Sequence, residues 1–271
     1  MRQAGSGVAQ RFQLLKKCRR VWTVSPIHGD AEKLIAAHNT IDTYFDVGDR
    51  IVYLGNYLGP GDSVKETIDE ILSFRRYTMA RPHLFRQDIA YLRGSQEEMW
   101  NKILQLQFAA TPVRIVEWMM ERGIVGTLKA YGSSANNALA NARGTVADLT
   151  RWTSELRAGM LQFPGHTEFL SNLKRAAYTD NNTMLFVHAG IDPNLALDQQ
   201  SDAFWWGNNE FNAIERRYYG FNRVVTGWDI QHSGVTETET KTVIDGGCGF
   251  GGNLLLGCFD AYGTLLSVIE N

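Results

Sequence analysis

Two histidines follow apolar segments in positions where their imidazoles could bind a metal ion. His28 comes shortly after the apolar segment 20–24, and His188 comes directly after the segment 184–187. Together they could hold a single ion, but zinc sites in proteins carry three or four protein ligands. Two imidazoles without a carboxylate make a weak site. We therefore favour the interpretation that both side chains form hydrogen bonds inside a pocket, with metal binding as the alternative.

Three further residues could complete such a metal site. Asp30, Asp229 and His232 lie near the same segments and carry suitable donor atoms. The spacing of the last two from Gly227 does not favour this role, and Asp30 fits the N-cap of a helix equally well.

Several tryptophans near the second half of the chain could form an aromatic platform for a ligand. These are Trp205, Trp206 and Trp228. Packing in the core is the more common use of such side chains, and we favour it here.

Short apolar segments position these residues. Residues 51–54 are too few for a helix and lead into a Gly/Asn/Pro-rich turn at 55–61, after which a helical pattern begins at Ser63. Similar units lie at 20–30, 88–97 and 184–190. Because α/β proteins place their chemistry in loops at the carboxyl ends of such strands, we expect four loops to meet at one site.

Composition indicates a globular protein. The 271 residues are 44% hydrophobic and 21% charged, and the net charge of −2 does not suggest a nucleic-acid partner. The three cysteines form neither a disulfide framework nor a metal-binding pattern, which favours a reducing compartment. No apolar segment reaches transmembrane length, and residues 1–10 lack a signal-peptide core. We expect a soluble cytoplasmic protein without a membrane partner.

The order of the segments predicts one main domain. Residues 1–19 are expected to form a helical or loose lead-in, and residues 20–271 a single domain. A mainly helical insertion is expected at about 110–180, lying against the loops, because long connections without strands are commonly functional elements. The last third contains short strands broken by Gly and Asp, which favours a second, partly antiparallel sheet.

Six short motifs occur in an order that resembles the calcineurin-like metallophosphoesterases, and within them the bacterial PPP-type serine/threonine phosphatases. The motifs are Ser25-Pro26-Ile27-His28-Gly29, residues 55–61, Leu92-Arg93-Gly94-Ser95-Gln96-Glu97, Val187-His188-Ala189-Gly190, Gly227-Trp228-Asp229 and residues 245–252. The resemblance covers the chain from about Val21 onward. It implies an α/β fold of four layers, α-β-β-α, with two facing sheets and a helical insertion.

The resemblance also implies a two-metal site, but the residues at the corresponding positions depart from it. The six ligand positions hold Pro26, His28, Asn56, Ser95, His188 and Trp228. Only the two histidines match, and two dications need hard anionic ligands. The general-acid position holds Gln96, which has no useful pKa, and the positions of two phosphate-binding arginines hold Pro60 and Gly207. The glycines of the motifs remain.

These departures predict a degenerate family member, a pseudophosphatase that acts by binding a protein partner or by self-association. We expect no cofactor. The alternative is an active serine/threonine-type phosphoesterase with a rearranged site or a single Mn, Fe or Zn ion, for which a carboxylate near His28 and His188 would be decisive. A third possibility is a homo-oligomer formed through the helical insertion.

Trp228 is expected to fill the former metal site. It replaces a smaller imidazole between retained glycines, so we predict that its indole is mostly buried and packs near Pro26 and His188.

Overall fold

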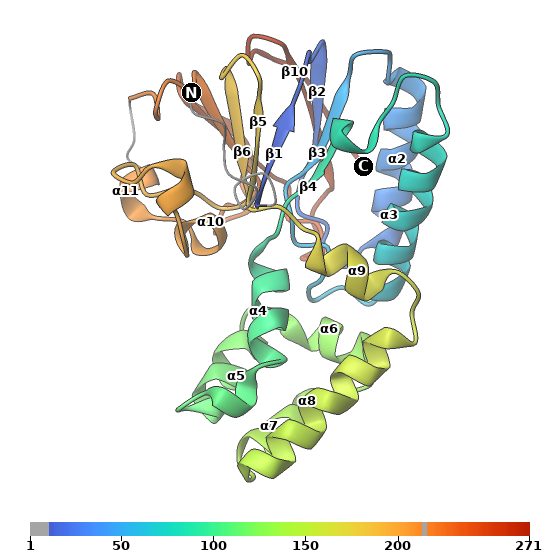
Figure 1. Ribbon diagram of the computed structural model, residues 1–271, viewed down its shortest axis with the longest axis vertical. Coiled ribbons are helices and arrows are strands. Elements are labelled where there is room, and N and C mark those ends of the chain that lie inside the picture. The colour runs from blue at the N-terminus through green and yellow to red at the C-terminus, as the bar shows by residue number, and fades with distance from the viewer. Residues whose placement is uncertain (1–10, 213–215) are drawn as a thin grey trace.

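Two β-sheets form the centre of the protein. The computed structural model describes residues 11–212 and 216–271 (Figure 1). The first sheet has the order β1-β5-β6-β7-β9-β8, and the second has the order β11-β10-β2-β3-β4. Their bounds are β1 Phe12–Leu15, β5 Ala176–Thr179, β6 Met184–Val187, β7 Arg223–Thr226, β8 Gly234–Glu237, β9 Lys241–Asp245, β2 Arg20–Val24, β3 Arg50–Tyr53, β4 Ile89–Tyr91, β10 Leu255–Asp260 and β11 Leu265–Glu270.

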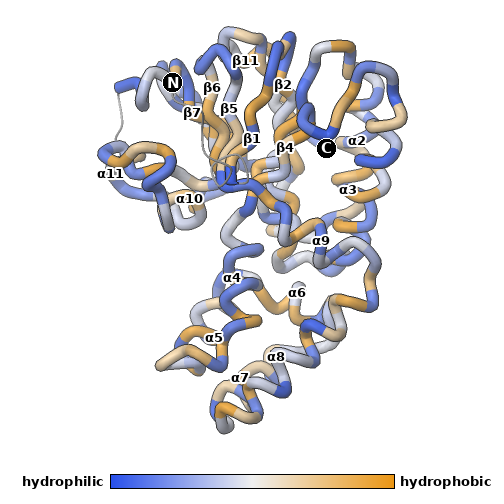
Figure 2. The backbone as a smooth tube through the Cα atoms, viewed as in Figure 1, coloured by the Kyte–Doolittle hydropathy of each residue, from blue (hydrophilic) through white to orange (hydrophobic). Residues whose placement is uncertain are grey.

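The two sheets pack face to face and share one apolar core. Val52 of the second sheet and Phe186 of the first belong to the same buried cluster, together with residues of β9 and β10. Central strands such as β3 and β6 are short and buried on both faces because helices cover the outer sides, which explains their continuous apolar runs, whereas β8 and β11 at the sheet edges are largely exposed. Figure 2 shows apolar residues concentrated along the strands and polar residues at the turns.

Helices form the outer layers. α2 (Ala31–Tyr44) and α3 (Val64–Met79) cover the second sheet, and their apolar residues join its core. α10 (Ala203–Trp206) and α11 (Asn209–Asn212) lie on the other side, where Phe204, Trp205 and Phe211 pack against the first sheet. The predicted α-β-β-α arrangement with two facing sheets is therefore confirmed. The predicted N-cap role of Asp30 is also confirmed, because its carboxylate accepts a hydrogen bond from the Lys33 amide at 3.1 Å.

The prediction of a helical or loose lead-in is wrong for residues 12–15, which form β1. This strand pairs in parallel with β5, with Phe12 opposite Ala176. Its partner lies far away in the sequence, and four residues that include Gln13 give too short a pattern to identify an edge strand. The part of the lead-in before Arg11 lies outside the described residues.

A group of helices projects from one end of the sandwich, as Figure 1 shows. We call α4 to α8 the helical lobe: α4 Ser95–Ile103, α5 Pro112–Met120, α6 Ile124–Ala130, α7 Ala135–Ala142 and α8 Val146–Leu161. α9 (His166–Ser171) leads back to the sandwich. Residues 110–180 are thus mainly helical, except that 176–179 form β5 and belong to the first sheet. Within the described residues, no helix is long and apolar enough to span a membrane.

Candidate functional site

The loops after β2, β3, β4, β6, β7 and β9 meet at the end of the sandwich that faces the helical lobe (Figure 1). A cavity of about 660 Å³ lies there. Five of the predicted site residues line it: His28, Asn56, Ser95, Gln96 and Trp228. Its remaining walls come from α4, from α5 and the turn that follows it, from the end of α10, and from loop residues 229, 230, 232 and 250. The sequence therefore identified most of the loops that converge and predicted a helical insertion against them, although it did not show which residues of the insertion would line the cavity.

Asn56 is the centre of a hydrogen-bond network at the base of this cavity. Its side-chain oxygen accepts hydrogen bonds from the Ser95 hydroxyl at 3.2 Å and from the backbone N–H of Gln96 at 2.9 Å. These donors identify the oxygen, so the other side-chain atom is the NH₂ group, which lies 3.3 Å from Nε2 of His28. Nε2 of His28 therefore acts as an acceptor. Asn56 is 1% exposed and has a backbone φ of 54°, a conformation that Asn tolerates better than most residues.

Glu97 fixes the loop on which Asn56 lies. Its carboxylate accepts hydrogen bonds from the backbone amides of Asn56, Leu58 and Gly94 at 2.8–3.0 Å. The side chain is 2% exposed, and burial raises its pKa while these amide donors oppose the rise. This retained glutamate therefore supports the scaffold. The motif indicated its presence, but only the geometry shows its role.

The two histidines are buried and differ in the atom that lacks a partner. Nδ1 of His188 donates to the Leu54 carbonyl at 2.7 Å, so its Nε2 is a bare acceptor, and this atom has no partner among the described residues. His28 presents the opposite case, because its Nε2 is the acceptor and its Nδ1–H lacks a partner in the described chain. Burial lowers the pKa of His28 to about 3 and that of His188 to about 4, so both are neutral near pH 7.

These donor atoms do not fit a two-metal site. The oxygen of Asn56 already accepts two hydrogen bonds, and Nε2 of His28 faces the Asn56 NH₂ group. Pro26 is buried, and a Cβ built on Gly227 would lie 3.0 Å from its Cδ, so it packs against that glycine. Of the two predicted histidine ligands, only His188 presents a ring nitrogen lone pair, at Nε2, that has no partner among the described residues. Within residues 11–212 and 216–271, no group of three His, Cys, Asp or Glu side chains could hold a metal ion.

The three remaining predicted positions also serve as scaffold. Gln96 donates through Nε2 to the Arg122 carbonyl at 2.6 Å, which joins α4 to the turn after α5. Pro60 packs on the same turn, because a Cβ built on Gly123 would lie 3.0 Å from its Cδ. Gly207 has φ of 72° and lies under the indole of Trp228.

The exposure of Trp228 is intermediate, in keeping with the prediction that it is mostly buried, but the prediction that it fills the former site is wrong. The side chain is only partly buried and lines the cavity, which stays open. A Cβ on Gly207 would lie 3.2 Å from Cζ3 of Trp228, so the ring rests against this glycine. The absence of a side chain at position 207 therefore lets the indole lie along the wall of the cavity. Trp205 is 5% exposed and packs in the core as predicted, whereas Trp206 lines the cavity.

The helical lobe contributes residues that the sequence analysis missed. Trp118 and Arg122 line the cavity, with the Arg122 guanidinium 4.3 Å from the centre of the Trp118 ring. Trp118 also contacts Trp206 edge to face at 5.2 Å. No motif marks these residues, and only the helical spacing of Trp118 within residues 112–120 indicated that it could face inward. Among the described residues, the walls of the cavity thus contain three indoles and a single arginine.

Asp229 and His232 also line the cavity, but their donor atoms are used in the loop. Nδ1 of His232 lies 2.9 Å from Oδ2 of Asp245, and the Asp229 carboxylate accepts from the amides of Gln231 and Ser233. Phe250 packs between the imidazoles of His28 and His232, with distances between ring centres of 4.9 and 4.7 Å. These contacts give both polar residues a structural role.

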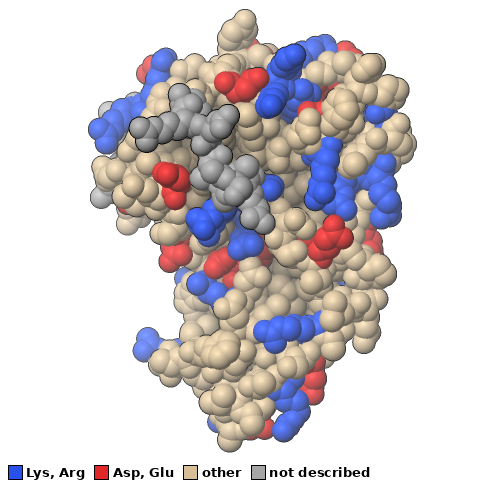
Figure 3. All heavy atoms as spheres, in the orientation of Figure 1, with Lys and Arg blue, Asp and Glu red and all other residues tan. Residues whose placement is uncertain are grey.

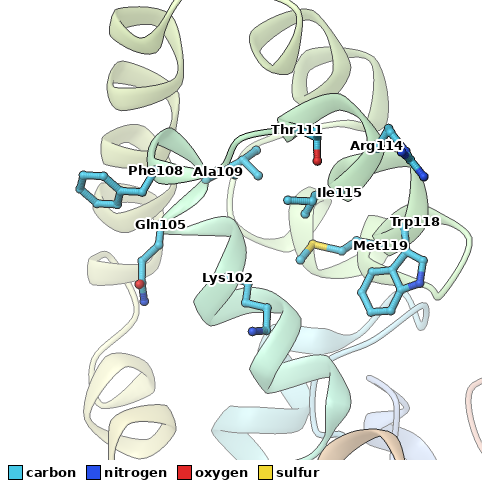
Figure 4. Close-up of a pocket in the computed structure, with 10 residues that line it drawn as sticks. Lys102, Gln105, Phe108, Ala109, Thr111, Arg114, Ile115, Trp118 and Met119 are labelled. Carbon is cyan, nitrogen blue, oxygen red and sulfur yellow. The ribbon is translucent and has the colours of Figure 1, made fainter. Parts of the chain in front are cut away.

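A second hollow of about 650 Å³ lies within the helical lobe, between α4 and α5. Figure 4 shows Ile115 and Met119 at its centre, while Phe108 points away from it. Phe108 is 82% exposed, and Trp118 lines both this hollow and the cavity described above. Four polar side chains, Lys102, Gln105, Thr111 and Arg114, line this hollow together with its apolar residues.

No family model matches this chain, and no curated protein is similar to it in sequence. Solved structures nevertheless share its fold. A proposed diadenosine tetraphosphatase has a TM-score of 0.54 at 16% identity, over 96% of this chain and 98% of that one. A cold-active protein tyrosine phosphatase has a TM-score of 0.51 at 13% identity, over 99% and 85% of the two chains. A protein serine/threonine phosphatase from Saccharomyces cerevisiae has 0.50 at 11% identity, over 96% and 82%.

Proposed function

We propose that this chain, which has the calcineurin-like metallophosphoesterase fold, is a pseudophosphatase. It acts by binding a protein partner or by self-association, and it does not hydrolyse phosphate esters. The proposal extends to a cytoplasmic protein of the bacterial PPP-type branch, in keeping with the motif order and with free thiols at Cys18, Cys248 and Cys258.

The observation that carries the proposal is the hydrogen-bond network of Asn56. The resemblance places a bridging carboxylate here, which would have to accept two metal ions. Instead, the amide oxygen accepts from Ser95 and Gln96, and the amide nitrogen lies against His28. Because both polar atoms of the Asn56 side chain have partners within the protein, this position does not depend on an ion to pair them.

The groups that would stabilise a phosphoryl transition state are also missing. Such catalysis relies on positive charges and donors aimed at the developing charge. Among the described residues that line the cavity, Arg122 is the one side chain with a fixed positive charge, and it stacks on Trp118 beside Glu121. The open indole surfaces are better suited to contact a partner than to bind a dianion.

The alternative, an active phosphoesterase with a rearranged or single-metal site, rests on one atom. Nε2 of His188 is a buried lone pair without a partner among the described residues, and a neutral imidazole in this state is a ready ligand for Mn, Fe or Zn. One ligand is nevertheless too few for a stable site.

Metal content and hydrolysis test the proposal together. Protein purified without a histidine tag and then incubated with Mn²⁺ should retain far less than one ion per chain by elemental analysis. It should not hydrolyse p-nitrophenyl phosphate above the level of a heat-denatured sample. Trp228→His should not restore turnover, because Pro26, Asn56, Ser95 and Gln96 remain.

Two outcomes would refute the pseudophosphatase. One is the recovery of two metal ions per chain. The other is turnover that His28→Ala abolishes and that the exposed control His83→Ala leaves unchanged. Mass measurement in solution then separates self-association from binding to another protein.

A further inference from the structure

A smaller pocket of about 230 Å³ lies on the side of the sandwich, where β1, β4, α3 and α9 come together. It shares no lining residue with the cavity at the loops. Two contacts fix its frame: the side chain of Gln13 donates to the Gln87 carbonyl at 3.1 Å, and the Lys174 amide donates to the Tyr91 carbonyl at 2.8 Å. Segments distant in sequence therefore build it on a rigid part of the fold.

Three positive charges line this pocket, from Arg75, Arg86 and Lys174, and its described lining contains no carboxylate. Neither arginine forms an ion pair with a described residue. Burial lowers the pKa of Lys174, and the nearby charge of Arg86 lowers it further. Figure 3 shows Lys and Arg side chains gathered on the half of the sandwich that carries α3. The charges of Arg86 and Lys174 therefore repel each other, and an anion bound beside them would relieve the repulsion.

The pocket also offers a hydroxyl and an apolar wall. The Tyr91 hydroxyl is buried and has no partner in the described part of the chain. Burial raises the pKa of this hydroxyl, and the positive charge of Arg75 opposes the rise. The ring of Tyr91 contacts Phe169 edge to face at 5.4 Å, and Leu173 completes this side. One side of the pocket thus favours an anionic group of a ligand, and the other side favours a small apolar group.

We propose that this pocket binds a small phosphate monoester. Its phosphoryl oxygens contact Arg75, Arg86 and Lys174, and its organic group lies against Tyr91 and Phe169. Guanidinium groups match phosphate oxygens through paired N–H donors. A monoester carries nearly two negative charges at neutral pH and so uses three cations better than a carboxylate does. The site is separate from the cavity at the loops and does not depend on the pseudophosphatase proposal.

Calorimetric titration of the full chain in EDTA, with inorganic phosphate and with phenyl phosphate, tests this inference. We expect both probes to bind and phenyl phosphate to bind more tightly, because it adds contact with the apolar wall. Arg75→Gln and Arg86→Gln should each weaken binding by about tenfold or more, since each removes a charge-assisted hydrogen bond. Arg86 is exposed, so its substitution leaves the core intact.

Two control variants locate the binding site. Arg76→Gln changes the next residue of α3, whose side chain bonds to Ser73 and does not line the pocket, and Arg122→Gln removes the arginine of the cavity at the loops. Both should bind the probes like wild type. The inference is overturned if neither probe binds, if Arg122→Gln abolishes binding, or if Arg75→Gln has no effect. Equal affinity for the two probes would indicate an inorganic phosphate site and would refute the monoester.

Discussion

At the scale of single residues, Asn56 shows how an amide takes over a position that the resemblance assigns to a charged ligand. A carboxylate can only accept hydrogen bonds, whereas an amide both accepts and donates. Its oxygen accepts from Ser95 and Gln96, while its NH₂ group faces a histidine nitrogen that a metal would otherwise need. One atom exchanged in one side chain thus gives the Asn56 side chain partners for both its oxygen and its NH₂ group, while Nε2 of His188 stays without a partner among the described residues.

Asn56→Ala should therefore destabilise the protein by about 2–4 kcal/mol, because buried donors of Ser95 and Gln96 lose their acceptor. Urea denaturation monitored by circular dichroism measures this change. Asn182→Ala is the matched control, since Asn182 has the same φ of 54° but is exposed. A loss of stability of equal size in both variants would attribute the effect to backbone strain and not to the network.

The buried histidines predict acid sensitivity. Burial lowers the pKa of His28 to about 3 and of His188 to about 4, below the ordinary value of 6.5. Between the lowered pKa of each folded histidine and the ordinary value of 6.5, the unfolded chain binds more protons than the folded one. The stability is therefore fully present above about pH 6.5 and is lost as the pH falls toward 4, by up to about 1.4 kcal/mol per pH unit for each histidine.

Urea midpoints measured between about pH 7.5 and pH 5 give this slope. The variant His28→Gln/His188→Gln should show a shallower dependence than wild type. Identical slopes would mean that other groups cause the acid sensitivity.

At the scale of elements, the carboxylate of Glu97 attaches the start of α4 to the loop after β3, in addition to the hydrogen bonds of Asn56. Glu97 accepts hydrogen bonds from the backbone amides of Gly94, Asn56 and Leu58. It therefore orders both the loop after β4 and the loop after β3. Its position three residues into the helix also lets it cap the helix N-terminus.

Glu97→Gln should lower the free energy of unfolding by about 2–4 kcal/mol, because one oxygen becomes an NH₂ group that faces backbone donors. The exposed Glu117→Gln on α5 should be neutral. Thermal denaturation of both variants measures the difference. A Glu97→Gln protein that melts like wild type would show that water can replace the carboxylate.

The elements also show what the sequence could predict. Apolar runs followed by glycine-rich turns identified β2, β3, β4 and β6, because buried strands leave this local pattern. β1 was missed, since its role depends on β5, more than 150 residues away. The site loops were predicted for the same reason as their strands. The orientation of Trp228 and the approach of Arg122 depend on tertiary contacts with Gly207 and the helical lobe, which leave no local pattern.

At the scale of the whole molecule, a buried histidine attaches the helical lobe to the sandwich. Nδ1 of His166 lies 2.9 Å from the hydroxyl of Tyr131, which follows α6, and Nε2 lies 3.1 Å from Asp69 of α3. The carboxylate can only accept, so Nε2 carries the proton and the tyrosine donates to Nδ1. The side chain of His166 is fully buried, and both of its nitrogens are used.

His166→Ala should destabilise the lobe by about 2–4 kcal/mol through lost hydrogen bonds and a cavity. Hydrogen exchange should become faster in α6 to α8 while the sheets keep their protection, because parts of a structure open separately. His83→Ala, at an exposed loop, is the control. Uniformly faster exchange in the sheets would show that lobe and sandwich unfold as one unit.

The pairing of β2 with β10 has a consequence for biosynthesis. The hydroxyl of Thr23 in β2 bonds to the carbonyl of Gly257 in β10, 234 residues later in the chain. The strand that emerges early from the ribosome therefore remains without one neighbour until β10 has also been translated. Meanwhile its apolar side chains stay open to wrong contacts, as expected for sheets built from distant segments. We therefore expect chaperones that shield nascent strands to raise the yield of folded protein while the segment between the two strands is synthesised.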